Sequence, residues 1–358
     1  MLKKNINSIF QTAAVFIGTI VGAGLASGQE ITQFFSTYGY VSFWGILICG
    51  LIYIVISSII VSISLKYKLS SYTELITIVS PGFFGVITDI FTSFFLITGA
   101  AIILAGSGAL VHQYFGISKW IGILLMSIIS LYTLLKDTKG LITINSFIVP
   151  ILTTIIITIF VLYLVLYKDM VNASYIKQIP SYKVNTIPAQ WFFSTLLYAG
   201  FNMLCCSGVL VPISQEIKHK RILIPGVIIG ALGLTILCYL INIMLLLNIP
   251  QIFKYEIPLL YITNRFGMLM QILLLCVIWF EMFSTEVSNI YSVGKTLEKK
   301  FNISYKKAVF LILIIALPIS QIGFKNLIKV LYPGFGAISL IFMIQCILFY
   351  RKTTKKHN

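Results

Sequence analysis

The sequence predicts an all-α integral membrane protein whose ten helices cross the bilayer as two inverted halves of five. Three observations lead to this fold class: the apolar composition, the distribution of positive charge, and interruptions at matching places in the two halves. Of the 358 residues, 58% are hydrophobic and 10% are charged, whereas a soluble domain is about half apolar and a quarter charged. Apolar runs of about 20 residues, each able to cross the hydrocarbon core, recur along the whole sequence.

The apolar runs define ten predicted spans. They cover residues 6–36, 41–65, 84–113, 118–135, 141–167, 190–215, 222–248, 266–294, 307–322 and 326–350. With the N-terminus in the cytoplasm, 18 of the 26 lysines and arginines fall in cytoplasmic segments. Because positive residues concentrate on the cytoplasmic side, we expect both termini in the cytoplasm, with the chain in the cell membrane. The net charge of +16 is therefore a topology signal, and no nucleic-acid partner is expected.

The longest outer connection, residues 168–189, divides the chain into two halves. Residues 1–167 form the first predicted repeat and residues 190–350 the second, followed by a basic cytoplasmic tail at 351–358. Since each half has an odd number of spans, the second half enters the membrane from the opposite side. Inverted repeats of this kind are a common transporter design.

In each half, a glycine-containing stretch interrupts the first predicted span. The first span carries "GTIVGAGLASG" (Gly18–Gly28), and the sixth carries "YAGFNMLCCSG" (Tyr198–Gly208). Interruptions at corresponding positions indicate a binding site near the membrane midplane, and glycine permits the unwound backbone that such a site uses. The alternative is that these glycines are close contacts between packed helices. For the two stretches together we favour broken helices in spans one and six.

These stretches resemble the amino acid–polyamine–organocation superfamily, whose members have the LeuT-type five-plus-five fold. "GTIVGAGLASGQEITQFF" is most similar to the YkvI-like amino-acid permeases of bacteria. Three further stretches agree with the superfamily: "SYTELITIVSPGFFG" (Ser71–Gly85), "SQEIKHKR" (Ser214–Arg221) and "FSTEVSNIYSVGKTLE" (Phe283–Glu298). The resemblance implies a secondary active transporter that works by alternating access, with a small-molecule substrate and the lipid bilayer as partners. Its oligomeric state stays open.

The interrupted first span predicts the substrate site. Unwinding there frees a helix N-terminus whose amide groups suit a carboxylate. By resemblance, backbone from the span-six interruption faces the amine of an amino acid. The predicted substrate-binding residues are Gly22, Ala23, Gly24, Leu25, Asn202, Cys205, Cys206, Ser207 and Gly208. No charged residue lies between Tyr198 and Gly208, which favours a neutral amino acid or a related zwitterion.

The resemblance also implies a sodium site, and no other cofactor is expected. Ser284 and Thr285 fall on the paired hydroxyl ligands of sodium-coupled relatives, and the carbonyls of Gly18 and Val21 fall on their first-span ligands. An all-oxygen set suits a hard cation. Glu281 lies one turn before the hydroxyl pair and is included in the expected site. Two alternatives remain: the hydroxyls bond to their own helix, or protons take the place of sodium.

Two further carboxylates, Glu30 and Glu286, lie within predicted spans. An intramembrane carboxylate costs about 2.5–3.5 kcal/mol on insertion scales, so it is a functional candidate by default. We expect Glu30 to pair with Lys325 or Lys329 as an extracellular gate, and Glu286 to have a gating or proton-carrying role. The alternative for Glu30 is a position near water without a partner.

An amino-acid-sensing membrane subunit of the germinant-receptor type binds its ligand without coupled flux and is the alternative to a transporter. An enzyme is not expected. Ser107 and His112 are five residues apart, which puts them on different faces of a helix and does not suit a nucleophile and its base.

Overall fold

The structure is a computed structural model that describes residues 2–136, 141–180, 182 and 189–355. Within these residues every regular element is a helix. The long helices are α1 (Leu2–Ile20), α4 (Ser42–Tyr67), α6 (Phe83–Phe115), α7 (Lys119–Lys136), α8 (Leu141–Leu166), α10 (Gln190–Ile217), α11 (Lys220–Leu246), α13 (Met268–Phe301), α14 (Tyr305–Ser320) and α15 (Phe324–Lys355). The short helices are α2 (Ala23–Ala26), α3 (Gln29–Phe34), α5 (Tyr72–Val79), α9 (Ala173–Gln178) and α12 (Pro258–Thr263).

Eight of the helices in the described residues are long and apolar enough to cross a membrane. They are α4, α6, α7, α8, α10, α11, α13 and α15. Residues Ile6–Ile20 of α1 form a shorter apolar helix, and α14 has 16 residues. Each predicted span therefore coincides with a long helix, although two of these helices are shorter than the usual length of a membrane-spanning helix.

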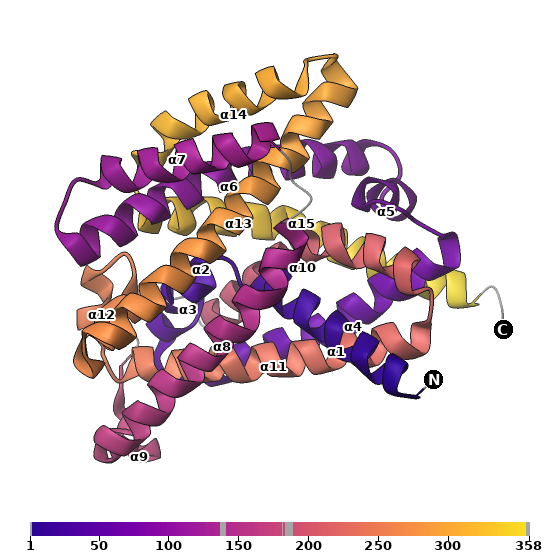
Figure 1. Ribbon diagram of the computed structural model, residues 1–358. Helices are drawn as coiled ribbons and strands as arrows, with labels where there is room; N and C mark the ends of the chain where they lie inside the picture. The colour runs from indigo at the N-terminus through magenta and orange to yellow at the C-terminus, as the bar shows by residue number, and fades with distance from the viewer. Residues whose placement is uncertain (1, 137–140, 181, 183–188, 356–358) are drawn as a thin grey trace.

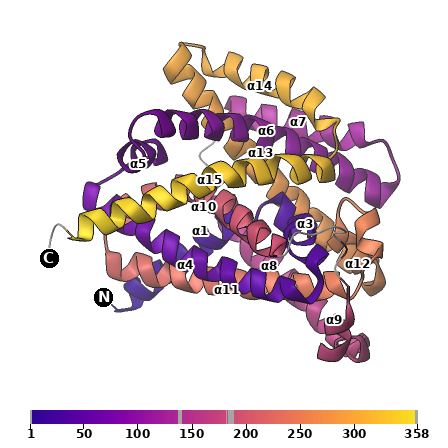
Figure 2. The same cartoon turned by 180° about the vertical axis from the view of Figure 1, so that it is seen from behind.

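The long helices pack into two groups joined by two further helices. Helices α1, α4, α10 and α11 contact one another, and so do α6, α7, α13 and α14. The second group lies at the top of Figure 1, while α1, α4 and α11 lie at the bottom. Helix α8 contacts α1, α11 and α13, and α15 makes the equivalent contacts with α10, α4 and α6. Figure 2 shows α15 running along the opposite side of the molecule. The contacts of α8 and α15 are therefore equivalent: each of these helices packs against the counterparts, in the other half, of the helices that contact its own counterpart.

The first predicted span is divided into three helices. Helix α1 ends at Ile20 and α2 begins at Ala23, with Gly22 in an extended conformation (φ −100°, ψ −171°). A second change of direction follows at Gly28, whose φ of +81° lies in the left-handed region before α3 begins. Glycine adopts this conformation without a Cβ penalty. The predicted glycine-rich stretch therefore holds both of these turns.

The sixth predicted span is not broken, so the prediction of a second interruption is wrong for this structure. Helix α10 runs without a break from Gln190 to Ile217. Its Gly200 packs against α15, where an added Cβ would lie 3.1 Å from the carbonyl oxygen of Gly336. The Ser207 hydroxyl donates to the carbonyl of Leu204 within the same helix, at 2.6 Å. The alternative interpretation of glycine as a close packing contact holds here.

Candidate functional site

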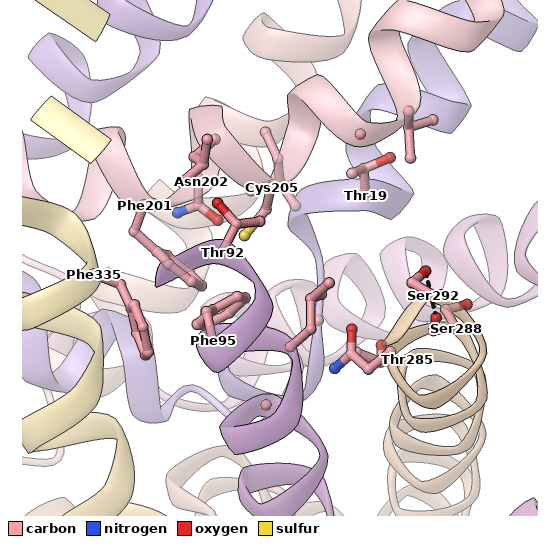
Figure 3. A pocket seen from close by; sticks show the side chains of 18 of the residues that line it. Thr19, Thr92, Phe95, Phe201, Asn202, Cys205, Thr285, Ser288, Ser292 and Phe335 are labelled. Atoms are coloured by element: carbon pink, nitrogen blue, oxygen red, sulfur yellow. Dashed lines mark hydrogen bonds between the residues drawn. The ribbon is translucent and has the colours of Figure 1, made fainter. Parts of the chain in front are cut away.

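A cavity of about 570 Å³ lies between the two groups of helices. Its walls come from α1 to α3 and α10 on one side, and from α6, α13 and α15 on the other. Figure 3 shows the side chains of Asn202 and Cys205 from α10 facing Phe95 of α6 and Thr285 of α13. The cavity therefore meets the chain where the first span is interrupted.

One end of the cavity is open and the other is closed. Gln11, Ser288 and Ser292 line it and are exposed, which places the opening near the start of α1 and the end of α13. At the other end Glu30 is only 3% exposed. Beyond it, Phe34 and Tyr198 are buried, with ring centroids 5.1 Å apart. Access is thus from the side that we predict to be cytoplasmic from the charge distribution.

The predicted substrate residues of the first span divide into two sets. Gly22 and Ala23 line the cavity, whereas Gly24 and Leu25 are buried behind its wall. The space that a Cβ on Gly24 would need is filled by the carboxyl group of Glu30. Gly24, predicted to contact the substrate, therefore contacts a side chain of the protein.

Glu30 lies at the closed end of the cavity and bonds to tyrosines. The Tyr198 hydroxyl donates to Oε2 of Glu30 at 2.8 Å, and the Tyr332 side chain also contacts this carboxyl group. The structure does not form the predicted gate, since Lys325 donates to the carbonyl of Phe253 at 2.5 Å and Lys329 is exposed. The carboxyl group of Glu30 instead faces Tyr198 and Tyr332.

The predicted substrate-binding residues of the sixth span also fall into two sets. Asn202, Cys205 and Gly208 line the cavity, whereas Cys206 and Ser207 are fully buried against the rest of the protein. Because α10 stays helical, the carbonyls of Cys205, Cys206 and Ser207 remain engaged in helical hydrogen bonds. The Gly208 carbonyl is the exception, since Pro212 has no N–H to donate to it. Nothing lies within 4 Å of a Cβ added at Gly208, so the space beside this carbonyl is open.

Sequence reasoning missed the aromatic part of the wall. The rings of Phe201 and Tyr332 stack with centroids 4.3 Å apart, and Phe95 meets Phe201 edge to face at 5.1 Å. Phe335 packs edge to face on Phe95 at 4.6 Å. In an apolar helix, aromatic spacing does not distinguish a cavity wall from a lipid-facing surface. No signal in the sequence could have singled out these four rings.

The predicted ion ligands lie close to the same cavity. Gly18 and Thr285 line it, while Val21, Glu281 and Ser284 are buried, each 1–2% exposed. Helix α13 packs against α2. Among the described residues, Oε2 of Glu281 has no hydrogen-bond partner. The same residues contain no group of three or more histidine, cysteine or acidic side chains that could hold a metal ion.

Glu286 lies on another face of α13 and does not line the cavity. It is 0% exposed, and neither of its carboxyl oxygens has a hydrogen-bond partner in the described part of the chain. Met282 and Asn289, one turn before and one turn after it, contact glycines of α6. Glu286 is therefore held at the contact between α13 and α6.

Ser107 and His112 form no catalytic pair. The Ser107 hydroxyl donates to the carbonyl of Gly122 at 3.0 Å and accepts from Trp279 at 3.2 Å. Nδ1 of His112 lies 2.7 Å from the carbonyl of Ile117. The two side chains have separate partners, as their five-residue spacing predicts.

Comparison with curated proteins finds relatives over the whole chain. The chain is 30% identical over 342 residues to the uncharacterized membrane protein YkvI of Bacillus subtilis, covering 96% of each chain. It is 24% identical to the uncharacterized protein YyaD of the same organism, covering 94% of this chain and 95% of YyaD. No protein-family model matches. Together with its apolar helices, the first relationship makes the chain a multi-pass membrane protein.

Comparison with solved structures finds the LeuT-type transporter fold. The inward-facing conformation of Mhp1 matches with a TM-score of 0.67 and 14% identity, covering 94% of this chain and 75% of Mhp1. A Na⁺-coupled sialic acid symporter matches with a TM-score of 0.65 and 15% identity, covering 94% of this chain and 78% of the symporter. MhsT in complex with L-phenylalanine matches with a TM-score of 0.59 and 16% identity, covering 92% of this chain and 88% of MhsT. None of these proteins is named as an enzyme, which agrees with the prediction that the chain is not one.

Proposed function

The chain belongs to the family of the Bacillus subtilis membrane protein YkvI, and we propose that it is a secondary active transporter of the amino acid–polyamine–organocation superfamily. It imports a small amino acid or a related zwitterion across the bacterial cell membrane. The observation that carries this proposal is the cavity between the two helix groups, which meets the interrupted first span and is open at one end only. A cavity of this kind, at the interface of two repeats, is the usual substrate site of such transporters.

The packing supports a mechanism of alternating access. Helices α1, α4, α10 and α11 form one rigid group, which rocks against α6, α7, α13 and α14. The ten long helices then span the membrane as two inverted repeats, residues 1–167 and 190–350, with both termini in the cytoplasm. The opening of the cavity beside Gln11 and Ser292 supports an inward-facing state within this proposed cycle.

The substrate lies against Gly22, Ala23, Asn202, Cys205 and Gly208, which all line the cavity. Ala23 begins α2, so its amide group has no partner within its own helix, and this group suits the substrate's carboxylate. The likeness to MhsT, solved with L-phenylalanine, supports an amino acid as the substrate.

Sodium drives the import in this proposal. Its ligands are the carbonyls of Gly18 and Val21, the hydroxyls of Ser284 and Thr285, and Glu281. The unpartnered Oε2 of Glu281 and the likeness to a Na⁺-coupled symporter support this set. The buried, unpartnered carboxyl group of Glu286 instead favours protons, which makes proton coupling the second candidate.

The test is uptake of radiolabelled amino acids by the purified chain in proteoliposomes. An inward sodium gradient should drive accumulation, whereas a choline gradient should not. Ligand binding without accumulation under any gradient would contradict transport and indicate a sensing subunit.

The double variant Ser284→Ala with Thr285→Ala should abolish the dependence of uptake on sodium, because two of the proposed oxygen ligands are lost. Ser292→Ala is the matched control. Ser292 lies about two turns further along α13 and its hydroxyl bonds to the carbonyl of Ser288 at 2.8 Å. Uptake by the double variant that persists unchanged in choline and follows a pH gradient would assign the coupling to protons.

A further inference from the structure

The structure leaves the substrate's amine without its predicted partners. The resemblance implies that the amine meets freed backbone of the sixth span, but α10 is an unbroken helix. The carbonyls of Cys205, Cys206 and Ser207 stay within helical hydrogen bonds. Only the Gly208 carbonyl lacks its helical donor, because Pro212 has no N–H. Among the residues that line the cavity, Glu30 is the single charged side chain. An ammonium group entering the cavity therefore meets one carboxyl group and no competing positive side chain from its wall.

We propose that Glu30, together with the aromatic rings of Phe201 and Tyr332, is the binding site for the substrate's ammonium group. The substrate class is then a small primary amine with an apolar body, for which the ammonium group is essential and the carboxylate is secondary. This inference rests on the proposed function, because it concerns the same cavity.

The position of the carboxyl group suits this role. Glu30 lines the cavity at its closed end and is 3% exposed. Its Oε2 accepts a hydrogen bond from Tyr198 at 2.8 Å, and its side chain covers Gly24. These contacts fix the direction of the carboxyl group. A buried carboxylate is unfavourable without a compensating charge, and a bound ammonium group provides that charge.

The aromatic rings supply the second part of the site. Tyr332 contacts the carboxyl group and stacks on Phe201 at 4.3 Å. Phe95 and Phe335 continue this wall, with ring centroids 4.6 Å apart, and Figure 3 shows Phe95, Phe201 and Phe335 grouped at one side of the cavity. Ring faces attract ammonium groups, and the remaining aromatic surface contacts an apolar substrate body.

The other buried acids offer no comparable site. Glu281 and Glu286 are buried but do not line the cavity. Glu256 pairs with Lys119. A ligand that enters the cavity therefore reaches Glu30 and none of these three.

The test is calorimetric binding to the purified full-length chain with three matched probe series. Alanine, leucine and phenylalanine are each compared with the N-acetyl amino acid, the amine that lacks the carboxylate, and the acid that lacks the amine. In at least one series, the amino acid and the simple amine should bind, while the N-acetyl compound and the acid bind at least 100-fold more weakly. Binding of the acids as tight as that of the amines, or binding of no amine in any series, overturns the proposal.

Variants then assign the site. Glu30→Gln should weaken amine binding at least 100-fold, and Glu216→Gln, on the exposed end of α10, should not change it. The wild-type probe series does not depend on any variant, so a failure of Glu30→Gln to fold leaves the proposal testable. If Glu30→Gln leaves sodium-driven uptake unchanged, the amine site is contradicted but transport is not. If amine-selective binding needs Glu30 but no gradient drives uptake, transport is contradicted but the amine site is not.

Discussion

Gly336→Ala should lower the stability of the whole protein more than the same substitution at Gly334, Gly24 or Gly22. A Cβ at this position would lie 2.4 Å from the carbonyl oxygen of Leu197 and 2.8 Å from its carbonyl carbon. These atoms belong to the backbone of α10, so no side chain can move aside, and the pair α10 and α15 must separate. Overpacking of this kind costs about 1–3 kcal/mol and sometimes more. We expect a clear drop in the midpoint of thermal unfolding in detergent.

Gly334→Ala, two residues away on the same helix, is the matched control for this prediction. No atom lies within 4 Å of a Cβ added at Gly334, and the residue is exposed. Its substitution should leave the unfolding midpoint nearly unchanged, because alanine favours a helix over glycine. Equal midpoints for the two variants would mean that α10 and α15 do not approach as closely as described.

Gly24→Ala should abolish ligand binding while the protein stays folded. An added Cβ at this position would overlap the carboxyl group of Glu30. Since this carboxyl group is the end of a flexible side chain, it can move, but only by leaving Tyr198 and the closed end of the cavity. We expect at least a 100-fold loss of amino-acid affinity by calorimetry, together with a smaller change in the unfolding midpoint than for Gly336→Ala.

Gly22→Ala provides the comparison within the same interruption. Gly22 has an extended conformation that any residue adopts (φ −100°), and nothing lies within 4 Å of its added Cβ. Because Gly22 lines the cavity, the methyl group should reduce affinity only modestly. A stronger loss at Gly22 than at Gly24 would show that the ligand, rather than Glu30, occupies the space near the backbone.

The sequence was sufficient to predict the helices and the first interruption, because both depend on local properties. Long apolar runs define the spans, and Gly22 and Gly28 mark the two turns between α1 and α3. The prediction of a break in the sixth span is wrong because the structure there depends on non-local contacts. Gly200 and Gly208 carry the same local signal, yet the close contact of Gly200 with α15 depends on tertiary packing that one sequence does not reveal.

The candidate site could be predicted only in part, for a similar reason. Gly18, Gly22, Ala23 and Thr285 reach the cavity because they lie at or beside the interruption. The hydrogen bond between Tyr198 and Glu30 joins residues 168 positions apart. Neither that pairing nor the aromatic wall has a local pattern. An intramembrane carboxylate signals function, but its partner is set by the fold.

Cys205 offers a direct measurement of alternating access of the cavity. Cys205 lines the cavity, whereas its neighbour Cys206 is fully buried. Variants that keep either Cys205 or Cys206 as their single cysteine are reconstituted in vesicles. They are treated from each side with a membrane-impermeant thiol reagent. In the absence of substrate, we expect Cys205 to react from the cytoplasmic side only. With sodium and saturating amino acid, reaction from that side should slow and reaction from the outer side should appear, while Cys206 stays unreactive throughout. Reaction of Cys205 from one side alone, whatever ligand is present, would contradict the transporter.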